Sequence, residues 1–238
     1  MSAPRRSPPP PGVGSYEIVE FGATAPATDL AELHTELLPS SPVARLGQSF
    51  LERFYYRALP AEGALFGAVA YVDGRPAGFQ VAAPEPGRLL SLALRRHRSV
   101  MARVAAGAVL RSPRRASAAW DTITIARSRS GDGFEAAAEL VSGGVRPEYR
   151  RSRLGHGAPW VFRDVVEAAL RRCPGDRPVF TLVDETNVPS QRFFRGHGWE
   201  PRGVVTAGWP VPQTRLVVER PGGHGRGAGP PQDRQGEA

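Results

Sequence analysis

The sequence predicts an α/β (α+β) domain built on one mixed sheet, and two observations indicate this class. Segments of strand type alternate with segments of helix type along most of the chain. The dipeptide Asp73-Gly74 lies between two apolar runs, which is a strong signal for an antiparallel hairpin. At 238 residues, the chain is long enough for one well-buried domain.

We place this domain at residues 15–219. The flanking segments, 1–14 and 220–238, are rich in Pro, Gly and polar residues. Such segments bury too little apolar surface to offset the entropy lost on ordering, so we expect both to be disordered.

The first half of the domain is predicted to hold one strand, two helices and the hairpin. Alternation of apolar and polar residues indicates the strand, and apolar residues at helical spacing indicate the helices. In chain order we expect a strand over 16–21, a helix over 30–38 with Asp29 as its N-cap, a helix over 43–59, and hairpin strands over 65–72 and 78–83.

The second half begins with a helical excursion over 86–120, rich in Leu, Ala, Val and Arg. After it we expect strands over 122–126 and 136–145, a loop over 146–157, a helix over 158–172, a strand over 178–183, a helix over 187–196 and a final strand over 203–209.

Composition excludes several classes of protein. The single cysteine, Cys173, allows neither an intramolecular disulfide nor a thiolate zinc site, and we expect no metal. No apolar stretch is long enough to span a bilayer, so we expect a cytoplasmic protein without a transmembrane segment. The net charge of +8 comes from arginine alone, because the chain has no lysine. This bias is typical of GC-rich bacterial coding, and without a nucleic-acid motif we expect no specific nucleic-acid partner.

The most informative stretch runs from Ala138 to Arg172, where a strand leads into an Arg- and Gly-rich loop that opens an amphipathic helix. Loop amides and the helix N-terminus then point towards one spot, which suits a phosphate group. The stretch resembles the acyl-CoA loop of the GNAT (GCN5-related) N-acetyltransferases, a strand with V-x-P-x-Y-R followed by (Q/R)-x-x-G-x-(G/A). The matching residues are Val145, Pro147, Tyr149 and Arg150. Two registers stay open: one matches Arg150 and Gly155, and the other matches Gly155 and Gly157.

A second segment, Asn187 to Trp199, resembles the same family. GNAT proteins carry N-x-x-(A/S)-x-x-(apolar)-Y-x-x-x-G-F after the fifth strand, and Asn187, Ser190, Phe193 and Gly198 fit that pattern. Phe194 stands where the family has the tyrosine assigned as the acid for the leaving thiolate, and phenylalanine has no proton to donate. Part of this segment also reads simply as a helix that ends on a Gly cap.

The resemblance covers roughly residues 16–209 and implies a GNAT fold. That fold has a mixed, mostly antiparallel central sheet whose fourth and fifth strands splay apart, with flanking helices; here it would hold a helical insertion between the third and fourth strands. The implied activity is acetyl transfer from acetyl-CoA, as co-substrate, to an amine. The residues that the resemblance implies in cofactor binding are Val145, Arg150, Arg153, Leu154, Gly155, His156, Gly157 and Asn187.

Glu139 is the candidate general base, because it resembles the glutamate that histone-acetylating members hold in this strand. A carboxylate flanked by apolar residues can have a raised pKa, which suits proton removal. Glu139 also fits a solvent-facing strand position. Asp184 and Glu185, just after the next strand, are second choices.

The basic insertion at 86–120 has three readings. It can be a packed helical pair with a solvated arginine face, a lid that attracts a phosphorylated or nucleotide-linked acceptor, or a contact with an anionic membrane surface. By analogy with similar insertions, an amino sugar or another small-molecule amine is the expected acceptor.

Alternative functions stay open beside the N-acetyltransferase. A protein or peptide acceptor would require an open acidic groove. Phe194 favours a catalytically silent acyl-CoA-binding module, whereas Glu139 argues against it. A basic adaptor for nucleic acid would show binding with steep salt dependence and no response to CoA. The edge strand after Trp199 could also pair two copies of the chain into a homodimer.

Overall fold

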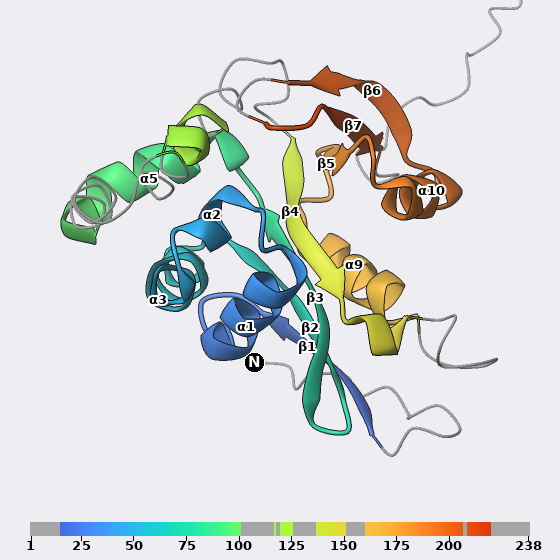
Figure 1. Ribbon diagram of the computed structural model, residues 1–238, viewed down its shortest axis with the longest axis horizontal. Coiled ribbons are helices and arrows are strands. Elements are labelled where there is room, and N and C mark those ends of the chain that lie inside the picture. The colour runs from blue at the N-terminus through green and yellow to red at the C-terminus, as the bar shows by residue number, and fades with distance from the viewer. Residues whose placement is uncertain are drawn as a thin grey trace, which may run out of the picture.

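A computed structural model describes residues 15–100, 117, 120–125, 137–150, 160–206 and 209–219. Seven strands form one sheet in the order β1-β2-β3-β4-β5-β7-β6 (Figure 1). All neighbouring strands are antiparallel except β4 and β5, which are parallel. The strands are β1 (Tyr16–Phe21), β2 (Phe66–Val72), β3 (Arg75–Ala83), β4 (Ala138–Val145), β5 (Val179–Asp184), β6 (Glu200–Val205) and β7 (Gln213–Val218). The mixed, mostly antiparallel sheet predicted from the sequence is confirmed.

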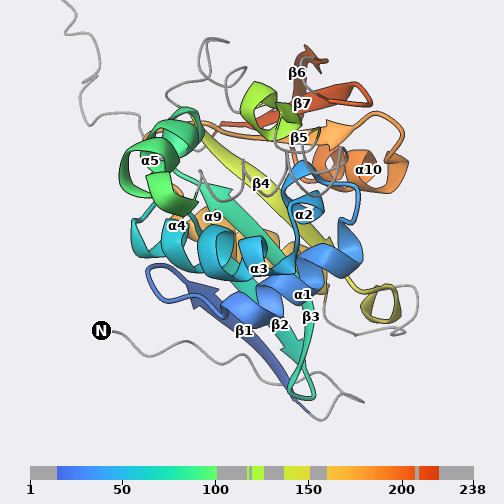
Figure 2. The same ribbon diagram turned by 60° about the vertical axis from the view of Figure 1, so that its left-hand side comes forward.

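Helices cover both faces of the sheet (Figures 1 and 2). On one face, α1 (Ala27–Leu37) and η1 (Leu51–Ala58) pack against the side chains of Val69, Phe79 and Val81. On the other face, α9 (Val161–Arg172) packs against β2, β3 and β4, and α10 (Val188–Gly196) adds Phe194 beside Leu140 and Leu216. The sheet therefore separates two cores, and a gap between its strands would connect the two faces.

The β2–β3 hairpin forms as predicted. Asp73 has φ of 51° and Gly74 has φ of 73°, so both turn residues adopt the left-handed conformation of a type I′ turn. Glycine adopts this conformation freely, and aspartate tolerates it better than most residues do.

The start of α1 differs from the prediction. The helix begins at Ala27 with Pro26 as N-cap, so Asp29 lies in the first turn and is not the cap. The Asp29 carboxylate instead accepts a hydrogen bond of 2.6 Å from the hydroxyl of Tyr71 on β2. A tertiary contact has thus taken the side chain that local capping would use.

The single helix predicted over 43–59 is broken. The chain forms α2 (Pro42–Arg45), α3 (Gln48–Phe50), the π-helix η1 and α4 (Leu59–Ala61). Gly47, between α2 and α3, has φ of 106°, which interrupts the helix. The Ser41 hydroxyl caps α2 by accepting from the Ala44 amide.

Two strand predictions were wrong in detail. Residues 120–125 are helical and not a strand, and Asp121 in that helix pairs with Arg45 at 3.0 Å. The predicted final strand over 203–209 is β6, which begins at Glu200, but a further strand, β7, follows and inserts between β5 and β6.

The insertion after β3 begins with η2 (Pro86–Arg88) and α5 (Leu89–Arg96), as the helical excursion predicted. Residues 101–116 of the insertion, and both predicted disordered ends, lie outside the described residues. No helix in the described part of the chain is long and apolar enough to cross a membrane.

Candidate active site

The sheet opens between β4 and β5. These strands pair only from Ala138 to Leu140, opposite Val179 to Thr181. At the last pair, the Thr181 hydroxyl donates to the Leu140 carbonyl at 3.0 Å. Beyond this point β4 stays with β3 as far as Val145, whereas β5 stays with β7 as far as Asp184. The two strands therefore splay, and the backbone of β4 beyond Leu140 has no β5 partner in the described sheet.

A cavity of about 630 Å³ occupies this gap. Its wall includes Phe162, Ser190 and Phe194 from the side of α9 and α10. It also includes His34 and Phe54 from the side of α1 and η1. Because these helices cover opposite faces (Figure 1), the cavity extends between the strands from one helical layer to the other.

A β-bulge shapes β4 at this point. Val81 pairs with Ser142 and Ala82 pairs with Leu140, so Val141 is the extra residue. The buried Gln80 side chain spans the irregularity: its Nε2 donates to the Val81 carbonyl at 3.0 Å and to the Ser142 carbonyl at 3.1 Å. These bonds satisfy two carbonyls next to the bulge and hold the β4 backbone at the gap.

Gly143 leaves room for the Gln80 side chain at the bulge, because glycine has no Cβ. A Cβ at position 143 would lie 2.2 Å from Gln80 Oε1 and 3.0 Å from the Phe79 carbonyl oxygen. Any larger residue would push the Gln80 side chain from the bulge or into the gap.

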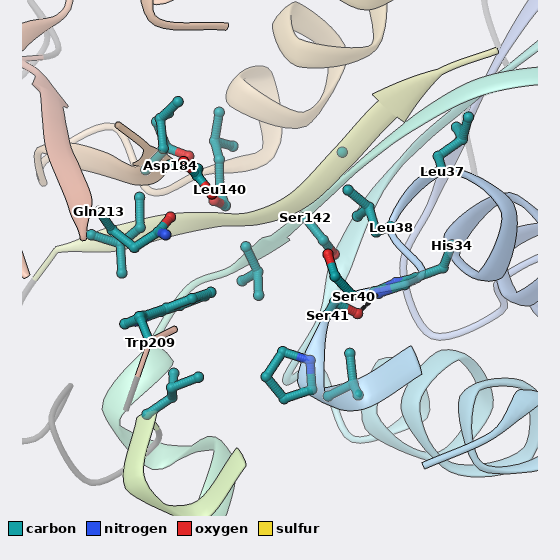
Figure 3. Close-up of a pocket in the computed structure, with 18 of the residues that line it drawn as sticks. His34, Leu37, Leu38, Ser40, Ser41, Leu140, Ser142, Asp184, Trp209 and Gln213 are labelled. Carbon is teal, nitrogen blue, oxygen red and sulfur yellow. Dashed lines mark hydrogen bonds between the residues drawn. The ribbon is translucent and has the colours of Figure 1, made fainter. Parts of the chain in front are cut away.

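The first polar side of the cavity, which we call the α1 flank, consists of His34, Ser40, Ser41 and Ser142 (Figure 3). Fully buried His34 lies in a hydrogen-bonded row, with Nε2 2.7 Å from Ser41 Oγ and Nδ1 2.5 Å from the Tyr56 hydroxyl. Burial lowers the pKa of His34 to about 3. Burial likewise raises the pKa of Tyr56 well above its ordinary value. Both groups are therefore neutral near pH 7, and the α1 flank is polar without charge.

The opposite side, which we call the β5 flank, consists of Asp184, Thr186, Asn187, Ser190 and Gln213. Asp184 and Gln213 are paired across β5 and β7, so their side chains share one face of the sheet (Figure 3). Asp184 Oδ1 accepts from the amide and the hydroxyl of Thr186 at 2.7 and 2.6 Å. The Trp209 ring stands beside this flank (Figure 3).

A third part of the wall, which we call the apolar arm, lies towards α2, η1 and α5 and consists of Leu38, Val43, Leu46, Phe50, Phe54 and Leu89. The arginines of the predicted basic lid that lie in the described part of the chain are outside this wall. Arg95, Arg96 and Arg98 are exposed, Arg96 pairs with Glu62, and none of the three lines the cavity.

The structure places the predicted site residues in different surroundings. Glu139 is fully buried, opposite Ala83 and Phe180, and is not solvent-facing; it does not line the cavity. Asn187 lines the cavity and also caps α10, because its side chain accepts from the Ser190 amide at 3.2 Å. Val145 packs its side chain against α9, and Arg150 is exposed.

The remaining predicted cofactor residues are Arg153, Leu154, Gly155, His156 and Gly157, which lie outside the described residues. Phe194, at the family's tyrosine position, lines the cavity and packs edge-on against Trp199, with 5.0 Å between ring centroids.

Sequence reasoning missed His34, Ser41 and Gln80. His34 lies within a helix, and nothing in its neighbourhood marks it as different from a core residue. Gln80 offered a weak signal, since it is the one polar residue in the run GFQVAA of a buried strand. A buried polar side chain needs hydrogen-bond partners, and here one is the carbonyl of the next residue, Val81, and the other lies 62 residues away in β4.

The chain matches no family model and no curated protein sequence. It is similar to solved structures. One is an acetyltransferase of the GNAT family from Bacillus cereus, with a TM-score of 0.51 and 12% identity over 87% of this chain and 99% of that chain. Another is the aminoglycoside acetyltransferase AAC(6')-Ib in complex with coenzyme A, with a TM-score of 0.46 and 16% identity over 87% of this chain and 95% of that chain. The sheet order, the splay of β4 from β5 and the likeness to the Bacillus cereus structure establish that this chain has the GNAT acetyltransferase fold.

Proposed function

We propose that the protein transfers an acetyl group from acetyl-CoA to an amine. The observation that carries this proposal is the cavity through the sheet at the β4–β5 splay. Acyl transfer requires the thioester and the amine to meet in line, in a site that holds both. A cavity lined by residues from both sides of a sheet has room for both.

The thioester would lie in the gap, with its carbonyl oxygen towards the β4 backbone. Backbone groups of Val141, Ser142 and Gly143 border the gap and have no β5 partner, so an N–H there can stabilise the oxyanion that develops during attack. Gln80 would act as a positioning residue, because it holds the carbonyls on either side of the bulge.

In the transfer, the amine nitrogen forms a bond to the carbonyl carbon and the carbon–sulfur bond breaks. An amine that binds as the ammonium ion first gives one proton to a base, since only the neutral amine has a lone pair for the attack. After the attack the nitrogen gives up a second proton, the leaving thiolate takes one proton, and the other is released to solvent. Two carboxylates compete for the role of base. Glu139 is the choice from the family resemblance, and Asp184 is the carboxylate that lines the cavity. Phe194 cannot donate, so the thiolate would take its proton from water.

The first experiment is a thermal-shift titration with acetyl-CoA, with ATP as the control ligand. At a hundredfold excess over Kd, binding adds about 2.7 kcal/mol of stability, which raises Tm by about 5–11 °C for a domain of this size. Turnover is then followed by thiol release from acetyl-CoA in the presence of primary amines.

A matched pair of variants locates the site. Gly143→Ala should reduce the acetyl-CoA shift, because the added Cβ meets Gln80 in the gap. Gly175→Ala adds the same atom where nothing lies within 4 Å, and the shift should persist. An equal shift for ATP, or equal shifts in both variants, would contradict a cofactor site in the splay.

A further inference from the structure

The wall of the cavity also identifies the class of acceptor, an inference that rests on the proposed acetyl transfer. We propose that the acceptor is a primary amine with an uncharged, mainly apolar body. Its ammonium group binds beside Asp184, and its body fills the apolar arm formed by Leu38, Val43, Leu46, Phe50, Phe54 and Leu89.

The apolar arm sets the chemistry of the acceptor's body. Its six side chains are aliphatic or aromatic, and Phe50 packs on Phe54 with 5.1 Å between ring centroids. A body with several hydroxyl groups would lose its hydrogen bonds to water without finding partners on these side chains, which disfavours binding. An alkyl or aryl body loses nothing and gains from leaving water.

The charges on the wall set the chemistry of the reacting end. Asp184 is the one acidic side chain among the described residues that line the cavity, and no arginine lines it there. Asp184 therefore attracts an ammonium group, and the Trp209 ring, which lines the same cavity beside Gln213 (Figure 3), offers a cation a second favourable contact. A phosphorylated acceptor would meet this carboxylate without a cation on the described wall to offset it.

The α1 flank leaves that preference unchanged. Fully buried His34 is neutral, and its two ring nitrogens are engaged by Ser41 and Tyr56. The flank therefore offers polar contacts at the splay without a positive charge that would repel the ammonium group. Charge complementarity at the cavity comes from Asp184.

The test compares amines by thiol release from acetyl-CoA. For linear amines from propylamine to hexylamine, kcat/KM should rise about fourfold per methylene group, roughly sixtyfold overall. Glucosamine and glucosamine 6-phosphate should be poorer acceptors than hexylamine. A flat series, or a preference for glucosamine 6-phosphate, would overturn the acceptor class while acetyl-CoA binding upheld the proposed function.

Two variants assign the effect to the apolar arm. Leu46→Gln, at similar volume, should lower kcat/KM for hexylamine about tenfold and leave propylamine little changed. Val204→Gln is the control, because Val204 is exposed on β6 and does not line the cavity. Should Leu46→Gln lower the Tm, the nearly isosteric Val43→Thr gives the same comparison.

A third experiment tests whether the apolar arm holds the acceptor or the acyl chain of the thioester. If octanoyl-CoA is used faster than acetyl-CoA with propylamine, the apolar arm holds the acyl group and the inference is wrong. If acetyl-CoA neither binds nor reacts, the proposed function itself fails, and the two failures are thereby distinguished.

Discussion

The two polar flanks of the cavity are built in different ways. The β5 flank draws Asp184, Thr186, Asn187 and Ser190 from seven consecutive positions, which a strand end, a turn and a helix cap hold in place. The α1 flank joins His34 and Ser41 to Ser142, about a hundred residues later in the chain. The β5 flank carries the carboxylate and the α1 flank carries no charge. Local structure thus supplies the carboxylate, and tertiary packing supplies the neutral flank opposite it.

The largest expected effect tests whether the β5 flank holds the base. Asp184→Asn should lower kcat/KM about 10²-fold or more, because the variant cannot accept the proton of the amine. Asp176→Asn, in the loop before β5, is the control and should behave as the wild type. If Glu139→Gln causes the loss and Asp184→Asn does not, the base lies in β4 and the contrast between the flanks fails. Thiol release measures all three.

The second effect concerns the bulge between the flanks. Gln80→Leu removes two hydrogen bonds from buried carbonyls, which should cost about 2 kcal/mol in the free energy of unfolding. It should also lower kcat about tenfold, since one misplaced oxyanion donor can cost that much. The Kd for CoA, which lacks the acetyl group, should stay unchanged. Urea unfolding, kinetics and calorimetry measure the three quantities.

A purely structural role for Gln80 would move stability without changing kcat. Gln80→Glu keeps the length of the side chain and, when protonated, one donor, so it should recover part of kcat at low pH. Gln48→Leu makes the same substitution at an exposed position, and it is the control for Gln80→Leu.

The third effect tests the charge of the α1 flank. The pKa of His34 is about 3 in the folded state, below its ordinary value of about 6.5, so the unfolded state binds the extra proton first. Stability should therefore fall as the pH falls from about 6.5 towards 3, by about 1.4 kcal/mol per pH unit from this group. Urea unfolding at pH 7 and pH 5 should show a loss of about 2 kcal/mol.

His34→Gln should remove this part of the pH dependence, because glutamine does not titrate. His197→Gln is the matched control, since His197 is exposed and should leave the slope as it is. An unchanged slope in His34→Gln would show that His34 is not the group responsible.

The smallest effect tests the local construction of the β5 flank. Asn187→Ala removes the cap of α10 and should cost about 1 kcal/mol in the free energy of unfolding. Asn187→Ser keeps a capping oxygen and should recover most of it. If alanine also weakens acetyl-CoA binding and serine does not restore that binding, Asn187 contacts the cofactor as the family resemblance implies. Thermal unfolding with and without acetyl-CoA separates the two roles.

The sequence by itself determined the features that depend on neighbouring residues. Asp73-Gly74 forms its turn because these residue types tolerate positive φ. The strand before the loop, the amphipathic helix α9 and the helix after Asn187 follow from periodicity and capping. The family resemblance, which also rests on local motifs, correctly implied the splay between β4 and β5.

Only the tertiary structure decided the features that depend on distant partners. Residues 120–125 have the β-branched composition of a strand, yet they are helical and pair with Arg45. The strand β7 inserts between β5 and β6, and Gln80 reaches the Ser142 carbonyl in β4. His34 is neutral because packing removes it from water, not because of its neighbours in sequence. Local propensity is worth tenths of a kcal/mol per residue, whereas burial and hydrogen bonds between distant segments are worth more, so the second kind of energy shaped the α1 flank.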